Sequence, residues 1–293
     1  MTVGASPMVR RRRLGGEVRL LREQHKLTNE QLAARLGWSV AKLSRLENAR
    51  VRPDLADVMN LLDELGVTGA KREQLILIAR DAADTSGWWR KYDKDVDPRQ
   101  LANAEMENSA IEIQEFQLTV VPGLLQTADY ARTRFESRPA VDLPPINVDA
   151  AVEARQTRQE VLTRDAPLSY RALIDETVIV RRCGPPGVLQ DQLAHLLKLT
   201  ELPNVEVRLF PYDGHTEGHY LPLCSFSLYR FADPSDPELA LLETGTSDLV
   251  LGDEEDVSRY KLIFKHLWET ALDPDTTRNS LTNAWQHSEE DLE

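Results

Sequence analysis

The segment from Leu27 to Asn48 constrains the fold more than any other part of the chain. Thr28 and Gln31 have the spacing of a capping box, in which two side chains bind the free amides at the start of a helix. Gly37 ends this helix, because glycine tolerates the positive φ of a tight turn. Ala33 is the small residue that two closely crossing helices need at their contact. The pattern predicts a short helix, a tight turn and a crossing helix.

The second helix of this pair is predicted from Ser39 to Asn48. Ser39 can cap it, while Leu43 and Leu46 share its inner face. Its outer face has two cations, small residues and no carboxylate. Two helices related in this way form a helix-turn-helix, whose second helix enters the major groove of DNA. An ordinary helical bundle with a basic face is the alternative interpretation.

The outer face of the second helix predicts contacts with base edges. Arg45 can pair bidentately with guanine, and Lys42 can do so less directionally or bind a phosphate. Val40 and Ala41 can touch a thymine methyl group. The residues assigned to base reading are Val40, Ala41, Lys42, Ser44 and Arg45.

Residues around this face are expected to bind the DNA backbone. Free amides at the start of the first helix of the pair would face a phosphate. The arginine run at 10–13 is expected to form a flexible arm on phosphates or in the minor groove. The residues assigned to phosphate binding are Thr28, Asn29, Ser39, Asn48, Arg50, Arg52, Arg11, Arg12 and Arg13.

The charge of the chain is divided unevenly along its length. The net charge is −13, yet the first 53 residues have 12 Lys or Arg against 4 Asp or Glu, so the remaining 240 residues carry −21. A basic N-terminal module joined to an acidic body is typical of a nucleic-acid binder whose body does not touch the phosphates.

Helical spacing of apolar residues extends beyond the central pair. It predicts five short helices at residues 14–83, forming an all-α domain, after a basic N-terminal arm at residues 1–13. Residues 84–100, with Gly87, Pro98 and several charges, are the predicted linker.

The remainder of the chain mixes helix and strand patterns. Helices are predicted at 101–116, 128–135, 148–163, 188–199 and 255–272. Strands are predicted at 169–182, 205–210, 223–231, 239–243 and 247–251. These elements predict an α+β domain at residues 101–286, with a mostly antiparallel sheet and flanking helices, followed by a polar tail at 287–293.

Residues 14–80 resemble the lambda-repressor and Cro-like helix-turn-helix family, also called XRE. The resemblance lies in Leu32-Ala33, Gly37, Ser39 and Leu43-Ser44-Arg45-Leu46-Glu47-Asn48. It implies a five-helix, lambda-repressor-like DNA-binding domain. Asn29 stands where the family often has a phosphate-binding Gln, and Ala49 where it often has Gly. A left-handed Ala49 would cost about 1 kcal/mol.

The rest of the chain is similar to actinobacterial regulators of the WhiJ-like, Scr antitoxin-like type. The matching stretches are 121–131, 155–162, 174–176 and 202–207. The resemblance implies a regulatory or interaction domain. It also implies a partner, a small protein often encoded beside such regulators in an arrangement likened to a toxin–antitoxin pair.

Other chemistry in the body has weak sequence support. Asp175-Glu176 at a strand end, with Arg155 and Arg158, is compatible with general acid–base chemistry or with a structural ion-pair network. His215-x3-His219 has metal-like spacing in a glycine-containing loop, but no further ligand completes a site.

The two cysteines, Cys183 and Cys224, are expected to be reduced and structural, with a disulfide between them as the alternative. We expect no metal, no cofactor and no enzymatic activity.

These features together predict a cytoplasmic, sequence-specific transcription regulator that binds double-stranded DNA as a homodimer. Its half-sites would lie about 10 bp apart, and its C-terminal domain would bind a small partner protein or ligand. No apolar run reaches the roughly 18 residues that cross a bilayer. The alternatives are an antitoxin-like protein that mainly neutralises a partner protein, and a small-molecule sensor or cryptic enzyme.

Overall fold

The computed structural model describes residues 6–137, 147–182, 184–185, 187–214, 222–244 and 247–290. Contacts divide them into two compact units. The N-terminal unit comprises the described residues up to Arg90 together with Phe231–Pro237. The body comprises the other described residues from Lys91 onward.

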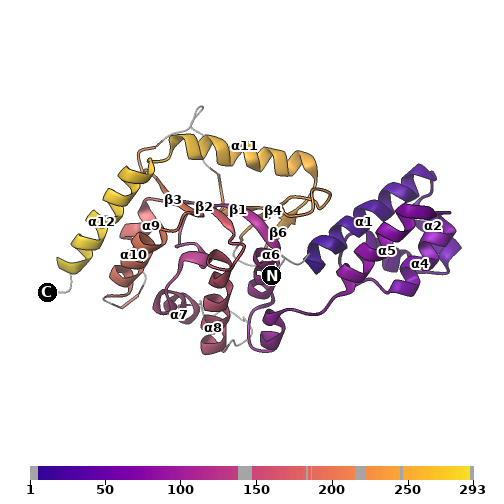
Figure 1. Ribbon diagram of the computed structural model, residues 1–293, viewed down its shortest axis with the longest axis horizontal. Coiled ribbons are helices and arrows are strands. Elements are labelled where there is room, and N and C mark those ends of the chain that lie inside the picture. The colour runs from indigo at the N-terminus through magenta and orange to yellow at the C-terminus, as the bar shows by residue number, and fades with distance from the viewer. Residues whose placement is uncertain are drawn as a thin grey trace. The chain divides into compact units, whose positions relative to one another are not determined.

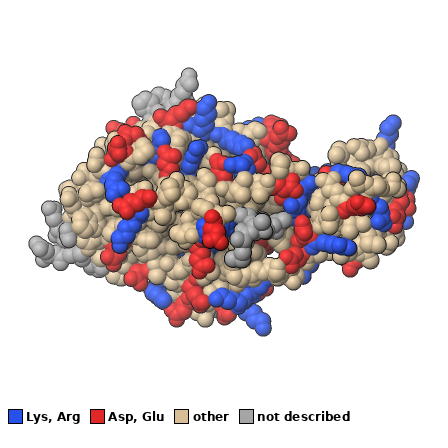
Figure 2. All heavy atoms as spheres, in the orientation of Figure 1, with Lys and Arg blue, Asp and Glu red and all other residues tan. Residues whose placement is uncertain are grey.

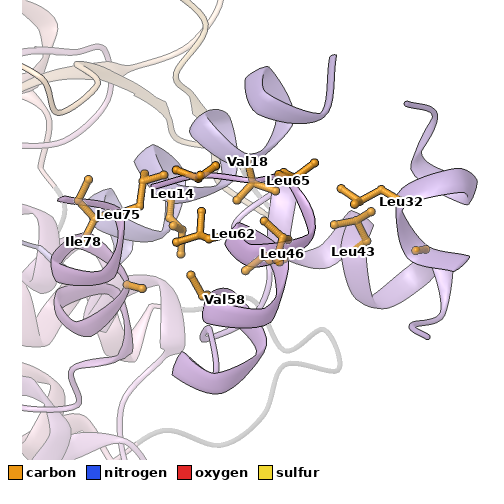
Figure 3. Packing of buried hydrophobic residues seen from close by; sticks show 14 residues of the cluster. Leu14, Val18, Leu32, Leu43, Leu46, Val58, Leu62, Leu65, Leu75 and Ile78 are labelled. Carbon is orange, nitrogen blue, oxygen red and sulfur yellow. The ribbon is translucent and has the colours of Figure 1, made fainter. Parts of the chain in front are cut away.

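The N-terminal unit is built from helices that share one apolar core, which confirms the predicted all-α region. The helices are α1 (Pro7–Gln24), α2 (Asn29–Leu36), α3 (Val40–Glu47), α4 (Leu55–Glu64) and α5 (Gly69–Ala83) (Figure 1). Leu14, Leu43, Leu62 and Leu75 are fully buried in the core. Figure 3 shows Leu32 of α2 and Leu43 of α3 beside one another at one end of it.

The first helix begins earlier than predicted. Ser6 caps it by accepting a hydrogen bond from the Val9 amide at 3.3 Å, and Pro7 occupies its first turn. Residues 7–13 are therefore helical, and the prediction that residues 1–13 form an arm was wrong for them. Proline favours this position because its ring fixes a helical φ.

The body contains a six-stranded sheet in the order β3-β2-β1-β4-β5-β6. The strands are β1 (Ala110–Gln117), β2 (Ser169–Asp175), β3 (Val205–Phe210), β4 (Phe226–Phe231), β5 (Leu239–Leu242) and β6 (Leu249–Leu251). β1 pairs with β2, and β2 with β3, in parallel, whereas β4–β5 and β5–β6 are antiparallel. The sheet is therefore mixed, which corrects the prediction of a mostly antiparallel sheet.

The segment 101–116 was predicted as one helix, and this is where the prediction of the sheet went wrong. The structure has helix α6 (Pro98–Ser109) followed at once by β1, the strand on which both halves of the sheet meet. The predicted strand at 169–182 likewise ends at Asp175 and continues into helix α9 (Thr177–Val180).

Helices cover both faces of the sheet (Figure 1). Helix α11 (Glu254–Thr270) packs Val257, Phe264 and Leu267 against apolar strand residues that include Phe116 and Phe226. The opposite face is covered by α6, α7 (Ala128–Glu136), α8 (Val148–Gln159), α9 and α10 (Val188–Leu199). Helix α12 (Pro274–Glu290) packs against α10 and β3.

Short 3-10 helices complete the described chain: η1 (Trp88–Tyr92), η2 (Gly123–Leu125) and η3 (Glu160–Leu162). The segment 84–100 contains η1 and the start of α6, so it has more structure than the predicted linker. Residues 287–290, the described part of the predicted polar tail, are the end of α12. None of the described helices is long and apolar enough to cross a membrane.

Candidate nucleic-acid interface

The start of α2 has the capping geometry predicted from the sequence. The Gln31 amide donates to Thr28 Oγ1 at 3.2 Å, and the Thr28 amide donates to Gln31 Oε1 at 2.9 Å. The helix ends at Gly37, which has a left-handed φ of 67°. Ser39 then caps α3 by accepting from the Lys42 amide at 3.2 Å. Side-chain caps and one glycine thus place the turn between α2 and α3.

Close helix contacts hold α3 in position. Ala33 of α2 is buried in the core with Leu43 and Leu46 of α3, as a tight crossing requires. Gly15 of α1 makes a second close approach, since a Cβ there would lie 2.5 Å from the Glu47 carbonyl oxygen. This second contact was not predicted, because the two residues are far apart in the chain.

A buried carboxylate joins α1, α2 and α3. Glu47 is only 5% exposed. It accepts hydrogen bonds from Arg22 Nε at 2.7 Å, Arg22 Nη2 at 3.0 Å and Asn29 Nδ2 at 3.3 Å. The hydrogen bond with Glu47 raises the pKa of Arg22 above its ordinary value. A carboxylate four residues after Leu43, on the inner face of α3, was the available sequence signal for this hub.

The Asn29 side chain belongs to this hub. Its Nδ2 donates to Glu47, and its Oδ1 is buried without a hydrogen-bond partner. The Asn29 side chain is therefore engaged within the helical unit, and the phosphate contact assigned to Asn29 from its place at the start of α2 stays a prediction. The Asn29 backbone amide remains in the first turn of α2, where helix N-termini bind anions.

The outer face of α3 presents several of the predicted base-reading residues. Val40, Ala41 and Arg45 are exposed. Ser44 is half-buried and lies beside Asn48, whose Nδ2 contacts its Oγ at 3.3 Å. Among the described residues, no hydrogen-bond or ion-pair partner is found for the Arg45 side chain, so its guanidinium is available.

Lys42 differs from Arg45 because its charge is already engaged. Its Nζ lies 2.6 Å from Asp57 Oδ2 of α4 and 4.2 Å from the centre of the Trp38 ring. A base contact by Lys42 would require breaking this ion pair. The contacts of Lys42 with Asp57 and Trp38 were not predicted from the sequence.

The end of α3 also affects the predicted phosphate contacts. Ala49 is left-handed, with φ 56°. The Arg50 amide donates to the Arg45 carbonyl at 2.8 Å, which closes the helix end. Asn48 accepts from Arg19 Nη2 at 2.9 Å, while Arg50 and Arg52 are exposed.

The N-terminal arginine run is largely tied down within its unit. Arg13 is buried and pairs with Asp233 at 2.7 Å and Asp236 at 3.1 Å. Arg10 reaches the same two carboxylates at 3.0 and 3.2 Å. The backbone amide of Ser235, followed by Arg13 and Arg10, lowers the pKa of Asp233 to about 2.

These contacts correct the picture of a free arginine arm. Arg13 cannot reach DNA without leaving its ion pairs with Asp233 and Asp236. Arg11 donates from Nη1 to the Ala82 carbonyl at 3.3 Å. Arg12 is half-buried on α1.

The chemical candidates of the body have local structural partners. Asp175 Oδ1 accepts from the Thr177 amide at 3.0 Å, and Glu176 Oε2 from the Tyr212 amide at 3.1 Å. Arg158 pairs with Glu107 of α6, at 2.7 Å from its Nε, and not with Asp175-Glu176. These carboxylates organise the start of α9 and its neighbouring loop.

The remaining candidates concern residues that are only partly described. Cys224 is a free, partly buried thiol. Cys183 and the His215–His219 pair lie outside the described residues, so their predicted roles stay predictions. Among the residues described, no group of three His, Cys, Asp or Glu side chains is placed to hold a metal ion.

Charges of both signs are interspersed on the face of the molecule that Figure 2 shows. Figure 2 shows basic side chains lying among acidic ones on the face in view, so the negative charge of the body is not gathered into one patch there.

Comparison with known families agrees with this geometry. Residues 13–75 match a family model described as a helix-turn-helix domain, which indicates a DNA-binding regulator. Residues 100–283, more than half of the chain, match the model described as a domain of unknown function (DUF5753). The chain belongs to this DUF5753 family. No curated protein and no solved structure matches it significantly.

Proposed function

We propose that the protein is a sequence-specific transcription regulator that binds double-stranded DNA through α3. The observation that carries the proposal is the outer face of α3, where exposed Val40 and Ala41 lie beside the unengaged Arg45. Such a face fits the major groove, in which arginine reads guanine. Arg50 and Arg52, which are exposed and follow α3, would bind phosphates.

The test is a selection of genomic DNA fragments with the purified full chain at physiological salt. The wild type is compared with Arg45→Ala and with Arg80→Ala, a matched control that removes an exposed arginine from α5. We expect a short palindrome that is enriched by the wild type and by Arg80→Ala and lost with Arg45→Ala. The absence of any enriched sequence with all three proteins would overturn the proposal.

A homodimer would read two half-sites on one face of the duplex. Their centres would then lie about 10 bp apart, or a multiple of one helical turn. Insertion of about five base pairs between the half-sites would rotate them to opposite faces and abolish tight binding. Unchanged affinity for the lengthened site would contradict the dimer.

The body would act as the regulatory part, binding a small partner protein or a ligand. The support is the resemblance to antitoxin-like regulators, together with a separate compact fold. Coexpression with the protein encoded next to the gene, followed by light scattering of the purified complex, tests the partner. A defined complex that protects cells from that protein would favour the antitoxin-like alternative, in which DNA binding only autoregulates the operon.

A further inference from the structure

A small polar cavity of about 150 Å³ lies inside the body where β1 ends. Residues of β1, the loop after it, β4 and α8 line the cavity. The order of the strands reverses at β1: β2 and β3 are added on one side of it, and β4–β6 lie on the other. In open α/β sheets, ligands bind at the carboxyl ends of strands at such a switch point. The position alone makes this cavity a candidate binding site.

One wall of the cavity holds two carboxyl groups in close proximity. Gln117 Nε2 donates to Glu115 Oε1 at 2.8 Å and to Glu243 Oε2 at 2.9 Å. Tyr170 Oη donates to the other oxygen of Glu115 at 2.6 Å. Burial, and next the charge of Glu243, raise the pKa of Glu115 to about 7. A cation between these two carboxyl groups would relieve their repulsion.

The α8 side of the cavity carries two arginines with different partners. Arg158 forms a buried two-point pair with Glu107, with distances of 2.7 and 2.5 Å, so its charge is neutralised. Arg155 has amide partners instead: its Nη1 donates to Gln126 Oε1 at 2.6 Å and its Nη2 to Gln100 Oε1 at 3.4 Å. No described carboxylate lies within ion-pair distance of Arg155.

Arg155 keeps unused binding capacity. Its Nε is buried without a hydrogen-bond partner. Burial, and next the charge of Arg158, lower the pKa of Arg155 to about 9, so the guanidinium is still charged at neutral pH. A buried charge without a counter-ion is costly, and a carboxylate bound in two-point fashion is its best complement.

We propose that this cavity binds a compact zwitterion, an α-amino acid with a short side chain. The ligand carboxylate would bind Arg155, and its ammonium group would lie between Glu243 and Glu115. The class follows from the lining, which places an uncompensated guanidinium and a carboxyl pair around one space. The size follows from the volume, which equals about five water molecules and lies well below the roughly 300 Å³ of pockets for drug-sized ligands.

The cavity also brings together two stretches that are distant in the sequence, 121–131 and 155–162. Gln126 accepts from Arg155 and donates from its own Nε2 to the Val121 carbonyl at 2.7 Å. Gln159 Nε2 donates to the Gln126 carbonyl at 2.6 Å. A ligand on Arg155 would therefore affect the loop between β1 and α7. The proposed binding site is formed by residues of the body alone. An effect of the ligand on DNA affinity rests on the proposed function.

The test measures binding to the purified full chain by calorimetry and by thermal shift. The probes are glycine, L-alanine and L-serine, with propionate and ethylamine as compounds that carry only one of the two charges. We expect at least one amino acid to bind and raise Tm, and the single-charge compounds to bind at least about tenfold more weakly.

Variants test both ends of the ligand. Arg155→Gln should weaken binding by about thirtyfold, whereas Arg278→Gln, which removes a surface guanidinium paired with Glu201, should leave it unchanged. If Arg155→Gln does not fold, Glu243→Gln provides the decisive variant at the ammonium end, with an expected loss of about tenfold.

Two results would overturn the proposal: no binding of any of the three amino acids to folded wild-type protein, or equal binding of propionate and L-alanine. Anisotropy with a selected DNA fragment separates this inference from the proposed function. DNA binding without amino-acid binding refutes the cavity proposal alone. Amino-acid binding by a chain that binds no DNA supports the cavity and refutes the regulator.

Discussion

Both units of the protein bury carboxylates beside arginines, but they balance these charges differently. In the N-terminal unit, Glu47 receives two hydrogen bonds from Arg22 and one from Asn29, so the hub is internally matched. In the body, Glu115 and Glu243 share one glutamine amide, while Arg155 contacts glutamine amides and the Phe135 ring and has no carboxylate partner among the described residues. The matched cluster can only stabilise the fold, whereas the unmatched one has charge left for a ligand.

Removing the matched carboxylate should give the largest effect on stability. Glu47→Ala removes the two-point carboxylate partner of the partly buried Arg22 and leaves it only the exposed Glu23 at 3.6 Å, and we expect a loss of about 3–5 kcal/mol in the free energy of unfolding. Urea unfolding of the full chain, followed by far-UV circular dichroism, measures this loss. Glu23→Ala removes an exposed carboxylate and should stay within about 0.5 kcal/mol of the wild type. Similar values for both variants would remove the distinction between a hub and a surface ion pair.

In the unmatched cluster, Glu115→Gln is expected to raise the free energy of unfolding, whereas Glu47→Ala lowers it. The folded-state pKa of Glu115, about 7, lies above its ordinary value of 4.5. Folding therefore takes up a proton between these values, and the free energy of unfolding falls as pH rises from about 4.5 to 7. Above pH 7 the full cost is about 3 kcal/mol, and the uncharged glutamine removes it.

Thermal unfolding of Glu115→Gln and the wild type across this pH range checks the prediction. The variant should match the wild type near pH 4 and exceed it at pH 8. A difference that is the same at both ends of the range would show that Glu115 does not titrate as described.

The exposed charge on α3 should affect DNA binding and leave folding unchanged. Arg45→Ala should cost about 1–3 kcal/mol in affinity for the selected site and relax one base position. Arg50→Ala should weaken binding to all sequences alike and reduce the salt slope by about one unit. Competition binding at several salt concentrations distinguishes the two, and equal losses across all sequences for Arg45→Ala would contradict its base-reading role.

The smallest expected effect concerns the end of α3. Ala49 has φ 56°, a conformation that glycine adopts without the strain of a Cβ atom. Ala49→Gly should therefore stabilise the N-terminal unit by about 1 kcal/mol. Ala34→Gly, on an exposed position inside α2, should destabilise it by a similar amount. Thermal unfolding should show a higher Tm for Ala49→Gly and a lower Tm for Ala34→Gly than for the wild type. A loss of stability for Ala49→Gly would contradict the strain argument.

The sequence by itself determined the helix-turn-helix, because its signals lie within a few residues of one another. The cap at Thr28, the left-handed Gly37 and the small Ala33 each act through neighbours in the same or the next helix. Their spacing located α2, the turn and α3 before any tertiary contact was known.

Only the tertiary structure decided the rest, because it depends on contacts between distant residues. The segment of β1 was predicted as a helix, since a central strand gains its hydrogen bonds from β2 and β4, which follow much later in the chain. The ion pair between Arg13 and Asp233 and the meeting of Arg155 with Glu115 and Glu243 at one cavity have no signature in local spacing. Local periodicity reports which face of an element is apolar, but the choice of partner is made by the packing of the whole chain.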